Sequence, residues 1–349
     1  MSNRNSILIR IIVWGVVAVM LLSALVVLLS RSAGGQSAFT APVWGDLRVM
    51  QEESFALDAI EDLEFDFSSM NITVYHTEES EMKVKLLANR ELRADERFVS
   101  SKDSGRITIQ NKPLMQSVFF FSWFSGFKKL EVYLPAQYQE KLSIKTSSGD
   151  VTLPDDTLNL RQMRLHASSG NLRGGSVQAE EEISIGLTSG DIRLQEVKSA
   201  RYQVQVTSGN TSINAIEGVG SIGGSSGDIR IGTLTGGEQN LSTASGNITL
   251  ERFTGSGTIS TQSGEIRMAS VLPQGDLDVR VTSGNVSMGL EKAAAAKVEA
   301  SVTSGTIRST MPLTYGHDDK RASGEIGENP SAMLSIRTTS GGIRLFEAE

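Results

Sequence analysis

One short turn motif, repeated ten times between Thr146 and Phe346, constrains this sequence more than any other feature. A Ser-Gly pair is followed in most copies by an acidic or amide residue, as in TSGDIRL at residues 188–194. The glycines stand at Gly149, Gly170, Gly190, Gly209, Gly227, Gly246, Gly264, Gly284, Gly305 and Gly341. The first nine follow one another at steps of 18 to 21 residues. Such a near-constant period predicts a stack of similar units.

Every unit alternates apolar and polar residues on both sides of its turn. In YQVQVTSGNTSINAI the apolar residues Tyr202, Val204 and Val206 precede the turn, and Ile213 follows it. A period of two indicates strands with one buried face. A single unit cannot bury that face, so we expect each unit to pair with the one before it. The sequence therefore predicts an all-β fold, a single-stranded parallel β-solenoid (β-helix) of about ten coils, right-handed by the chirality of parallel crossovers.

The turn glycine has a conformational role in this prediction. Glycine adopts a positive φ angle at a corner without the steric penalty of other residues. If the coils stack directly, Gly190, Gly209 and Gly227 lie in a single file, one strand spacing apart. The interrupted spacing between Gly305 and Gly341 predicts an insertion or an irregular coil there.

Composition excludes several classes of function. The net charge of −7 and the absence of a long basic run argue against a nucleic-acid partner. The chain has no cysteine, which removes disulfides and thiolate metal sites. Its three histidines, His76, His166 and His317, are far apart in sequence. The segments GVGSIG and GGSSG resemble nucleotide-binding and nucleophile motifs, but no helix pattern follows either of them. We therefore expect no catalytic residue, no metal and no cofactor.

A second pattern runs through the residue that follows each turn glycine. Acidic and amide residues alternate there over eight units: Asp150, Asn171, Asp191, Asn210, Asp228, Asn247, Glu265 and Asn285. Arginine stands two residues after three of the acids. The resulting candidate surface ladder consists of Asp191, Arg193, Asp228, Arg230, Glu265 and Arg267.

Two interpretations of this ladder remain open. In the structural one, an interposed Asn doubles the distance between carboxylates, which at ~4.8 Å would repel by about 0.9 kcal/mol in water, and it donates hydrogen bonds to the acids above and below. In the functional one, the ladder is a striped surface that binds a repetitive polymer.

The start of the chain predicts a membrane anchor. Residues 11–30 include an uncharged run from Ile11 to Leu29, long enough as a helix to span a bilayer. Arg4 and Arg10 precede it, so residues 1–10 are expected in the cytoplasm and the C-terminal domain outside the cell membrane. Residues 31–49 read as a tether. The alternative is a cleaved signal peptide, with processing near SAGGQSA.

Residues 50–140 predict irregular first coils and a cap, ahead of a solenoid at 141–349. FSSMNITV is a degenerate copy of the turn with Met70 in place of glycine. An aromatic segment at residues 118–129 contains Phe119, Phe120, Phe121, Trp123, Phe124 and Phe127, followed by two lysines. It is either a cap loop over the solenoid end or a membrane-contact loop in the bilayer interface.

With its SSGD and TSGN repeats and its N-terminal anchor, the chain resembles the bacterial envelope family of putative adhesins, a β-strand-repeat domain of unknown function. The likeness covers roughly residues 50–349. The resemblance implies a β-helical extracytoplasmic module and assigns no catalytic residue.

Repeat, anchor and resemblance together predict a non-catalytic, membrane-anchored surface module for adhesion, envelope-polymer binding or envelope-stress signalling. Its expected partners are the membrane, through the N-terminal helix, and an envelope polysaccharide or a membrane protein. The alternative is a polysaccharide lyase or hydrolase on a β-helix. An enzyme would show one groove of Asp, Lys or Arg that departs from the regular columns.

Overall fold

The computed structural model describes residues 46–111 and 127–348, and within them the chain is all-β, with one sheet of 23 strands and one short 3-10 helix. All the described strands belong to one compact unit, which begins at Leu47. Across the described ranges no helix has the length and apolar character that a bilayer crossing requires. The predicted anchor at residues 11–30 and most of the predicted tether lie outside these ranges.

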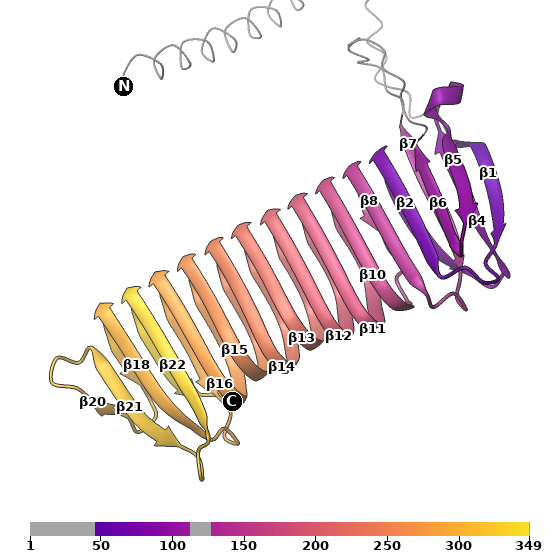
Figure 1. Ribbon diagram of the computed structural model, residues 1–349. Helices are drawn as coiled ribbons and strands as arrows, with labels where there is room; N and C mark the ends of the chain where they lie inside the picture. Colours follow the sequence, from indigo (N-terminus) through magenta and orange to yellow (C-terminus); the bar gives the residue numbers. More distant parts are fainter. Residues whose placement is uncertain (1–45, 112–126, 349) are drawn as a thin grey trace, which may run out of the picture. The chain divides into compact units, whose positions relative to one another are not determined.

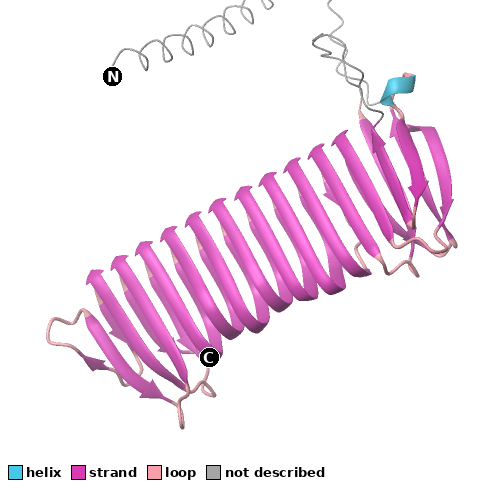
Figure 2. Ribbon diagram, viewed as in Figure 1, coloured by secondary structure: helices cyan, strands magenta, loops and turns pink. Residues whose placement is uncertain are grey.

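The middle of this compact unit is a stack of parallel coils, each formed by one long strand (Figure 1; Figure 2). These strands are β10 (Thr157–Ser169), β11 (Leu172–Ser189), β12 (Ile192–Ser208), β13 (Thr211–Ser226), β14 (Ile229–Ser245), β15 (Ile248–Ser263) and β16 (Ile266–Ser283). Every strand in this series pairs in parallel with the next along most of its length. The predicted stacking of successive units is confirmed for this part of the chain.

Strand β12 shows how one coil is built. Its pairing with β13 runs from Ile192 to Lys198, shifts in register before Arg201, and continues to Ser208. A register shift of this kind bends a strand, so one continuous strand passes round the coil. The inward residues are nearly inaccessible to solvent: Ile192, Leu194, Val197, Tyr202, Val204 and Val206. They join the equivalent residues of the other coils in one continuous core.

The turn glycines form the expected single file. Gly190, Gly209 and Gly227 have φ angles of 133°, 138° and 129°. A Cβ atom added to Gly209 would lie 2.0 Å from the carbonyl oxygen of Gly190, and one added to Gly227 would lie 2.0 Å from that of Gly209. Glycine is therefore required for two reasons: the backbone angle is positive, and the next coil approaches too closely for a Cβ atom.

At the N-terminal end the order of the coils departs from the order of the sequence. The elements here are β1 (Arg48–Ala56), β2 (Asp62–Ser69), β3 (Asn71–Thr77), β4 (Glu81–Ala88), η1 (Ala94–Glu96), β5 (Phe98–Asp103), β6 (Arg106–Asn111), β7 (Lys128–Pro135), β8 (Lys141–Ser148) and β9 (Val151–Thr152). Strand β2 lies between β6 and β8, and β3 lies between β7 and β9. The first coil in the sequence is thus enclosed by two later ones.

Met70 stands in the glycine file at this end, as the degenerate motif predicts. Its backbone N–H donates to the carbonyl oxygen of Ser148 at 2.8 Å, and a Cβ atom on Gly149 would lie 2.2 Å from the Met70 carbonyl oxygen. The Met70 side chain is buried. Beyond β6 and β7 the sheet becomes antiparallel, through the pairs β5–β6, β4–β7 and β1–β4.

The C-terminal end shows the same departure. Its strands are β17 (Val286–Leu290), β18 (Ala296–Ser304), β19 (Ile307–Ser309), β20 (Thr314–Tyr315), β21 (Arg321–Ile326), β22 (Ala332–Ser340) and β23 (Ile343–Glu347). Strand β22 lies between β16 and β18, and β23 between β17 and β19. The last coil is therefore inserted between two earlier ones, and the glycine file runs Gly284, Gly341, Gly305.

This arrangement corrects one expectation. Units do not always pair with the unit before them, because the coils at both ends are interleaved. Of the two alternatives for the segment between Gly305 and Gly341, the structure has the insertion: β20 and β21 form an antiparallel end piece on β18, and the chain then returns to fill the gap beside β16. An antiparallel end piece covers the last parallel coil, which limits the open edge that a bare solenoid would present.

Candidate functional site

The strand segments that precede the turns form one side of the stack, and its exposed residues lie in straight columns. The residue directly before the turn is serine in every coil. In order along the stack this column is Ser69, Ser148, Ser169, Ser189, Ser208, Ser226, Ser245, Ser263, Ser283, Ser340 and Ser304. All of these serines are exposed. With strands about 4.8 Å apart, hydroxyl groups recur at that interval along the stack.

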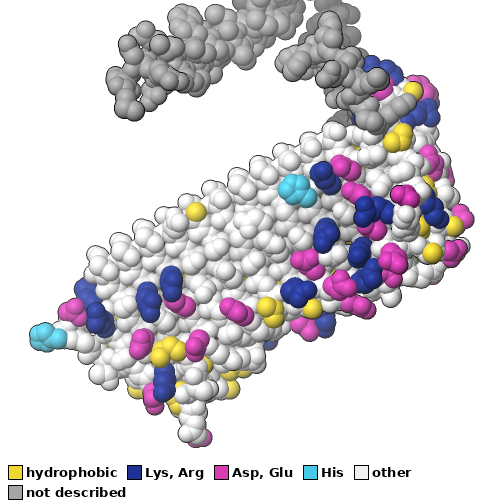
Figure 3. Space-filling view, viewed as in Figure 1, with side chains coloured by type: hydrophobic (Ala, Val, Ile, Leu, Met, Phe, Trp, Pro, Cys, Tyr) yellow, Lys and Arg dark blue, Asp and Glu magenta, His cyan; other side chains and the backbone are white. Residues whose placement is uncertain are grey.

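The five middle coils carry a surface without charge on this side. We define the neutral face as the residues one, two, four and six positions before Gly190, Gly209, Gly227, Gly246 and Gly264. They are Ser184, Gly186, Thr188, Ser189, Gln203, Gln205, Thr207, Ser208, Ser221, Gly223, Ser225, Ser226, Asn240, Ser242, Ala244, Ser245, Thr258, Ser260, Gln262 and Ser263. None of them is buried, none is charged and none is a large hydrophobic residue. Figure 3 shows this uncoloured area between charged groups at the two ends of the stack.

Glycines in the neutral face leave room for the long side chains of neighbouring coils. A Cβ atom on Gly223 would lie 2.3 Å from Oε1 of Gln205, and one on Gly186 would lie 3.1 Å from Nδ1 of His166. The long side chains of the neighbouring coils therefore lie over these glycines. A shallow hollow of about 330 Å³ begins here, lined by residues that include His166, Gly186 and Gln205.

The predicted ladder lies on the other side of the turn and is joined by hydrogen bonds. Oδ1 of Asp191 accepts from the backbone N–H and from Nδ2 of Asn210, at 2.9 and 3.2 Å. The side-chain oxygen of Asn210 in turn accepts from the backbone N–H of Asp228 at 3.0 Å. The side chains of Asn171, Asn210 and Asn247 thus donate to the acid on one side only, whereas the sequence predicts donation on both sides. Asn71 extends the ladder by one coil, because its Oδ1 accepts from the backbone N–H of Asp150 at 2.9 Å.

The arginines of the ladder pair with the acids on their own strands. Arg193 lies 2.9 Å from Asp191, Arg230 lies 2.5 Å from Asp228, and Arg267 lies 2.6 Å from Glu265. The backbone N–H of Asn210 holds the pKa of Asp191 below its usual range, with a contribution from Arg193. The N–H of Asn247 does the same to the pKa of Asp228. The structure therefore places the six predicted ladder residues as three ion pairs on alternate coils, and Asn210 and Asn247 link these pairs along the stack.

The other predicted site residues are less fully placed. Phe119, Phe120, Phe121, Trp123 and Phe124 lie outside the described residues. Phe127 directly precedes β7, and 41% of it is exposed. Among the described residues no group of three His, Cys, Asp or Glu is arranged to hold a metal ion.

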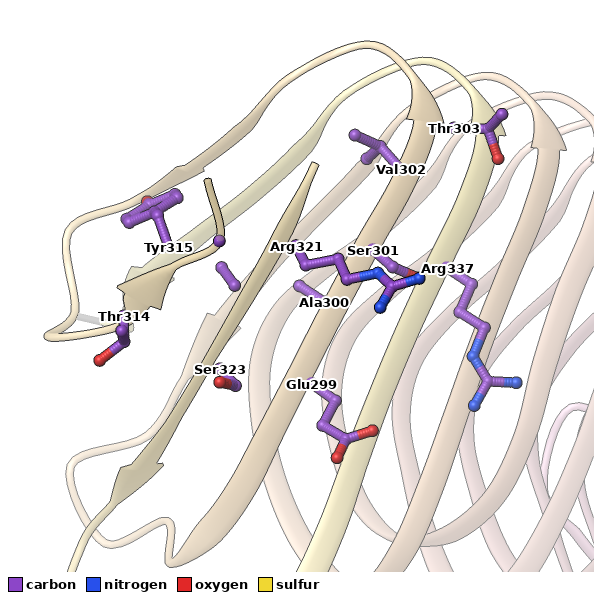
Figure 4. A pocket seen from close by; sticks show the side chains of 12 residues that line it. Glu299, Ala300, Ser301, Val302, Thr303, Thr314, Tyr315, Arg321, Ser323 and Arg337 are labelled. Carbon is purple, nitrogen blue, oxygen red and sulfur yellow. The ribbon is translucent and has the colours of Figure 1, made fainter. Parts of the chain in front are cut away.

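A groove at the C-terminal end is a second candidate site, and the sequence analysis did not anticipate it. It has a volume of about 590 Å³ and lies between β18, β20, β21 and β22 (Figure 4). Its polar lining includes Glu299, Ser301, Tyr315, Arg321, Ser323 and Arg337. Glu299 is the one acidic residue in this lining.

The neutral face is also a feature that sequence reasoning missed. The signal was present in the sequence, since the positions four and six residues before the turn lack charge in five consecutive copies. The groove left no comparable signal, because Arg321 belongs to an antiparallel strand outside the repeat.

The repeated turns, the stacked coils and the interleaved ends define a solenoid-like β-repeat protein. The family model described as Toastrack DUF4097 matches residues 60–235 and 219–345, and the chain belongs to this family. No curated protein matches the chain.

Solved structures similar to this chain come from several bacteria. A putative adhesin from Bacteroides fragilis is 12% identical, with 84% of this chain and 96% of that chain covered and a TM-score of 0.36. A putative adhesin from Parabacteroides distasonis is 11% identical, with 86% and 97% covered and a TM-score of 0.32. A putative cell adhesion protein from Clostridium sporogenes is 13% identical, with 85% and 99% covered and a TM-score of 0.21.

Proposed function

We propose that this protein is a non-catalytic, membrane-anchored extracytoplasmic module that binds an envelope polysaccharide along its neutral face. The observation that carries the proposal is the face itself: four exposed or half-buried columns without a charge across five consecutive coils. Hydroxyl and amide groups both donate and accept hydrogen bonds, as do the hydroxyl groups of sugars. A surface without charges also avoids the desolvation penalty of covering ions over a broad contact.

The spacing of the columns suits a repetitive ligand. Equivalent side chains recur at about 4.8 Å, close to the length of one sugar unit in an extended chain. A polymer lying along the stack repeats the same contacts from coil to coil. Many weak contacts on one rigid surface add up in the way that linked binding sites do.

The proposed location rests on the sequence. Residues 11–30 have the length and apolar character of a membrane anchor, and the preceding arginines favour a cytoplasmic N-terminus. The C-terminal domain would then lie outside the cell membrane. The aromatic residues of the segment 118–129, which ends in Lys128 and Lys129, suit the bilayer interface.

A polysaccharide lyase or hydrolase is the second candidate function, because the C-terminal groove departs from the regular columns. Most glycoside hydrolases use two carboxyl groups on either side of the scissile bond. The groove has Glu299 as its sole acidic lining residue, which favours binding without hydrolysis. A lyase is tested directly by measuring chain cleavage in the binding experiment below.

Co-sedimentation with insoluble cell-envelope polysaccharide tests the proposal, with the full chain in detergent micelles. Thr207→Glu with Ser242→Glu places two charges on the neutral face. Ala200→Glu with Ala269→Glu is the matched control, since both alanines are exposed outside that face. We expect the first pair to weaken binding by about tenfold or more and the control pair to retain it. Equal binding by both pairs would refute the neutral face as the binding surface, and release of shortened chains would refute a non-catalytic role.

A further inference from the structure

Two arginines in the C-terminal groove lie in one row across neighbouring strands. Arg337 of β22 pairs with Ser301 of β18, and Ser301 pairs with Arg321 of β21. The two arginines are therefore separated by a single strand. Figure 4 shows both side chains on the same side of the sheet, with the side chain of Arg321 extending over β18 toward β22.

Neither arginine has an acidic partner among the residues that the structure describes. Within the described ranges the side chains of Arg321 and Arg337 form no ion pair and no hydrogen bond, whereas Arg280, the next residue along the same row, pairs with Asp278. The arginines of the ladder are likewise paired with acids of their own strands. Glu299 lines the groove on β18, but it lies beyond ion-pair distance of both guanidinium groups. Two guanidinium groups thus face solvent in a partly enclosed groove.

This composition suits an anionic ligand group. The planar guanidinium group presents two parallel N–H donors that match the oxygens of a carboxylate or a phosphate. The hydroxyl groups of Ser301, Ser323 and Tyr315 line the same groove and supply further donors. Arginines that served only solubility could stand anywhere on the surface. Here they are one strand apart and lie beside hydroxyl groups, which favours a binding role.

The groove is continuous with the neutral face. The column four residues before the turn glycine runs along the face through Ser242 and Ser260 and continues to Arg280, Arg337 and Ser301. A polymer that follows this column beyond the neutral face passes Arg280, which is paired with Asp278, and then reaches the two unpaired arginines.

We infer that the C-terminal groove binds a carboxylate or phosphate group of an acidic polysaccharide whose neutral sugars lie along the neutral face. Arg321 and Arg337 hold the anionic group, and the hydroxyl groups of the groove hold the sugar that carries it. This inference rests on the proposed function and names its ligand class more closely.

Binding of defined oligosaccharides to the full chain tests the inference. The probes are an oligogalacturonate and its carboxyl-reduced neutral counterpart, with inorganic phosphate as a separate arm that distinguishes the two kinds of anion. We expect Arg321→Gln and Arg337→Gln each to weaken oligogalacturonate binding by about tenfold, and the neutral counterpart to bind equally to the variants and the parent. Arg193→Gln is the matched control, because this arginine is paired in the ladder, and it should retain binding.

The outcomes separate this inference from the proposed function. Parent-like oligogalacturonate binding by the Arg321 and Arg337 variants, or a lack of binding of both anions to the parent chain, would overturn the inference. If the inference is overturned in this way but the Thr207→Glu, Ser242→Glu variant still loses polysaccharide binding, the proposed function stands without the inference. Loss of binding in the arginine variants with full binding in the neutral-face variant would overturn the face and support the groove. Competition by inorganic phosphate at low concentration would assign a phosphate-bearing polymer in place of a carboxylated one.

Discussion

The middle coils and the two ends of the stack use the same repeat in different ways. From β11 to β15 each coil pairs only with the coil before it and the coil after it in the sequence. At each end one coil is inserted between two others, β2–β3 at one end and β22–β23 at the other. Local stacking builds the middle, and long-range insertion builds the ends.

The difference shows how the stack of coils ends. A repeat with only nearest-neighbour contacts can fray from its last unit, since that unit has one neighbour instead of two. Insertion places β22 and β23 inside the stack at one end and β2 and β3 inside it at the other, so the outermost parallel positions are taken by coils that have strands on both sides in sequence. Antiparallel strands then cover these outer coils. Insertion therefore protects the last strands of this unit from fraying, whereas β1 at the other end pairs with β4 in the antiparallel end piece.

The largest predicted effect comes from removing an inserted coil. A chain that ends at residue 330 lacks β22 and β23, and with them the buried residues Leu334, Ile336, Ile343 and Leu345. Burial of four such side chains contributes about 6 to 12 kcal/mol. We expect the amides of β18 and β19 to lose their protection from hydrogen exchange, while those of β12 to β14 keep it.

A deletion confined to residues 312–319, bridged by a short Gly-Ser linker, is the control for this truncation. It removes the exposed strand β20 and leaves the inserted coil in place. Loss of protection throughout the stack in the truncated chain would show that the middle depends on the ends, against the nearest-neighbour picture.

The second prediction concerns the glycine file. Gly209→Ala places a Cβ atom 2.0 Å from the carbonyl oxygen of Gly190 in a backbone conformation that alanine rarely adopts. We expect a loss of about 3 kcal/mol or more in the free energy of unfolding, seen as a lower melting temperature by circular dichroism. Gly186→Ala is the matched control, since its Cβ atom would meet only the His166 ring at 3.1 Å. Similar melting temperatures for the two variants would contradict the role of the file.

The middle of the stack is also the part that the sequence predicts best. Strand alternation around TSGDIRL, the corner glycine and the period of about 19 residues are local signals, and each follows from contacts with the adjacent repeat. Even Met70, which lacks the glycine, was recognisable from its neighbours. The insertion of β22 has no such signal, because the sequence between Gly305 and Gly341 does not specify which earlier strand will receive the returning chain.

The candidate sites divide in the same way. The ladder residues are recognisable because the charges recur at one position, and the structure brings them together. The neutral face is defined by the absence of charge at positions such as Ser221 and Ser242, and this becomes visible when the repeat copies are aligned on their turn glycines. The pairing of Arg321 with Ser301 arises from the antiparallel end piece, which the repeat does not encode.

The third prediction compares two asparagines of the ladder. The substitution Asn210→Asp would place a carboxylate between those of Asp191 and Asp228, and it would remove the Nδ2 hydrogen bond to Asp191. Repulsion by two like-charged neighbours at ~4.8 Å should lower the free energy of unfolding by about 2 kcal/mol at low salt. Asn285→Asp has an acid on one side only, because its other neighbour is Gly342, and should lose about half as much. Melting temperatures in low and high salt measure this, and equal, salt-independent shifts would count against an electrostatic role for the alternation.

The smallest predicted effect is the acid response of the ladder. Hydrogen bonds from Asn210 and Asn247 lower the pKa values of Asp191 and Asp228 in the folded chain below the ordinary value of 3.8. A lowered pKa in the folded state means that the ionised form stabilises the fold above the unfolded-state pKa, and that this stabilisation disappears as the pH falls through the folded-state pKa. Stability should therefore decline more steeply below about pH 4 in the parent than in an Asp191→Asn, Asp228→Asn variant, as measured by denaturant unfolding between pH 2 and pH 6. Because both carboxylates are partly exposed, solvent keeps this difference in stability small. Parallel pH profiles for the two proteins would show that the ladder acts through shape and hydrogen bonding, without a contribution from its charge.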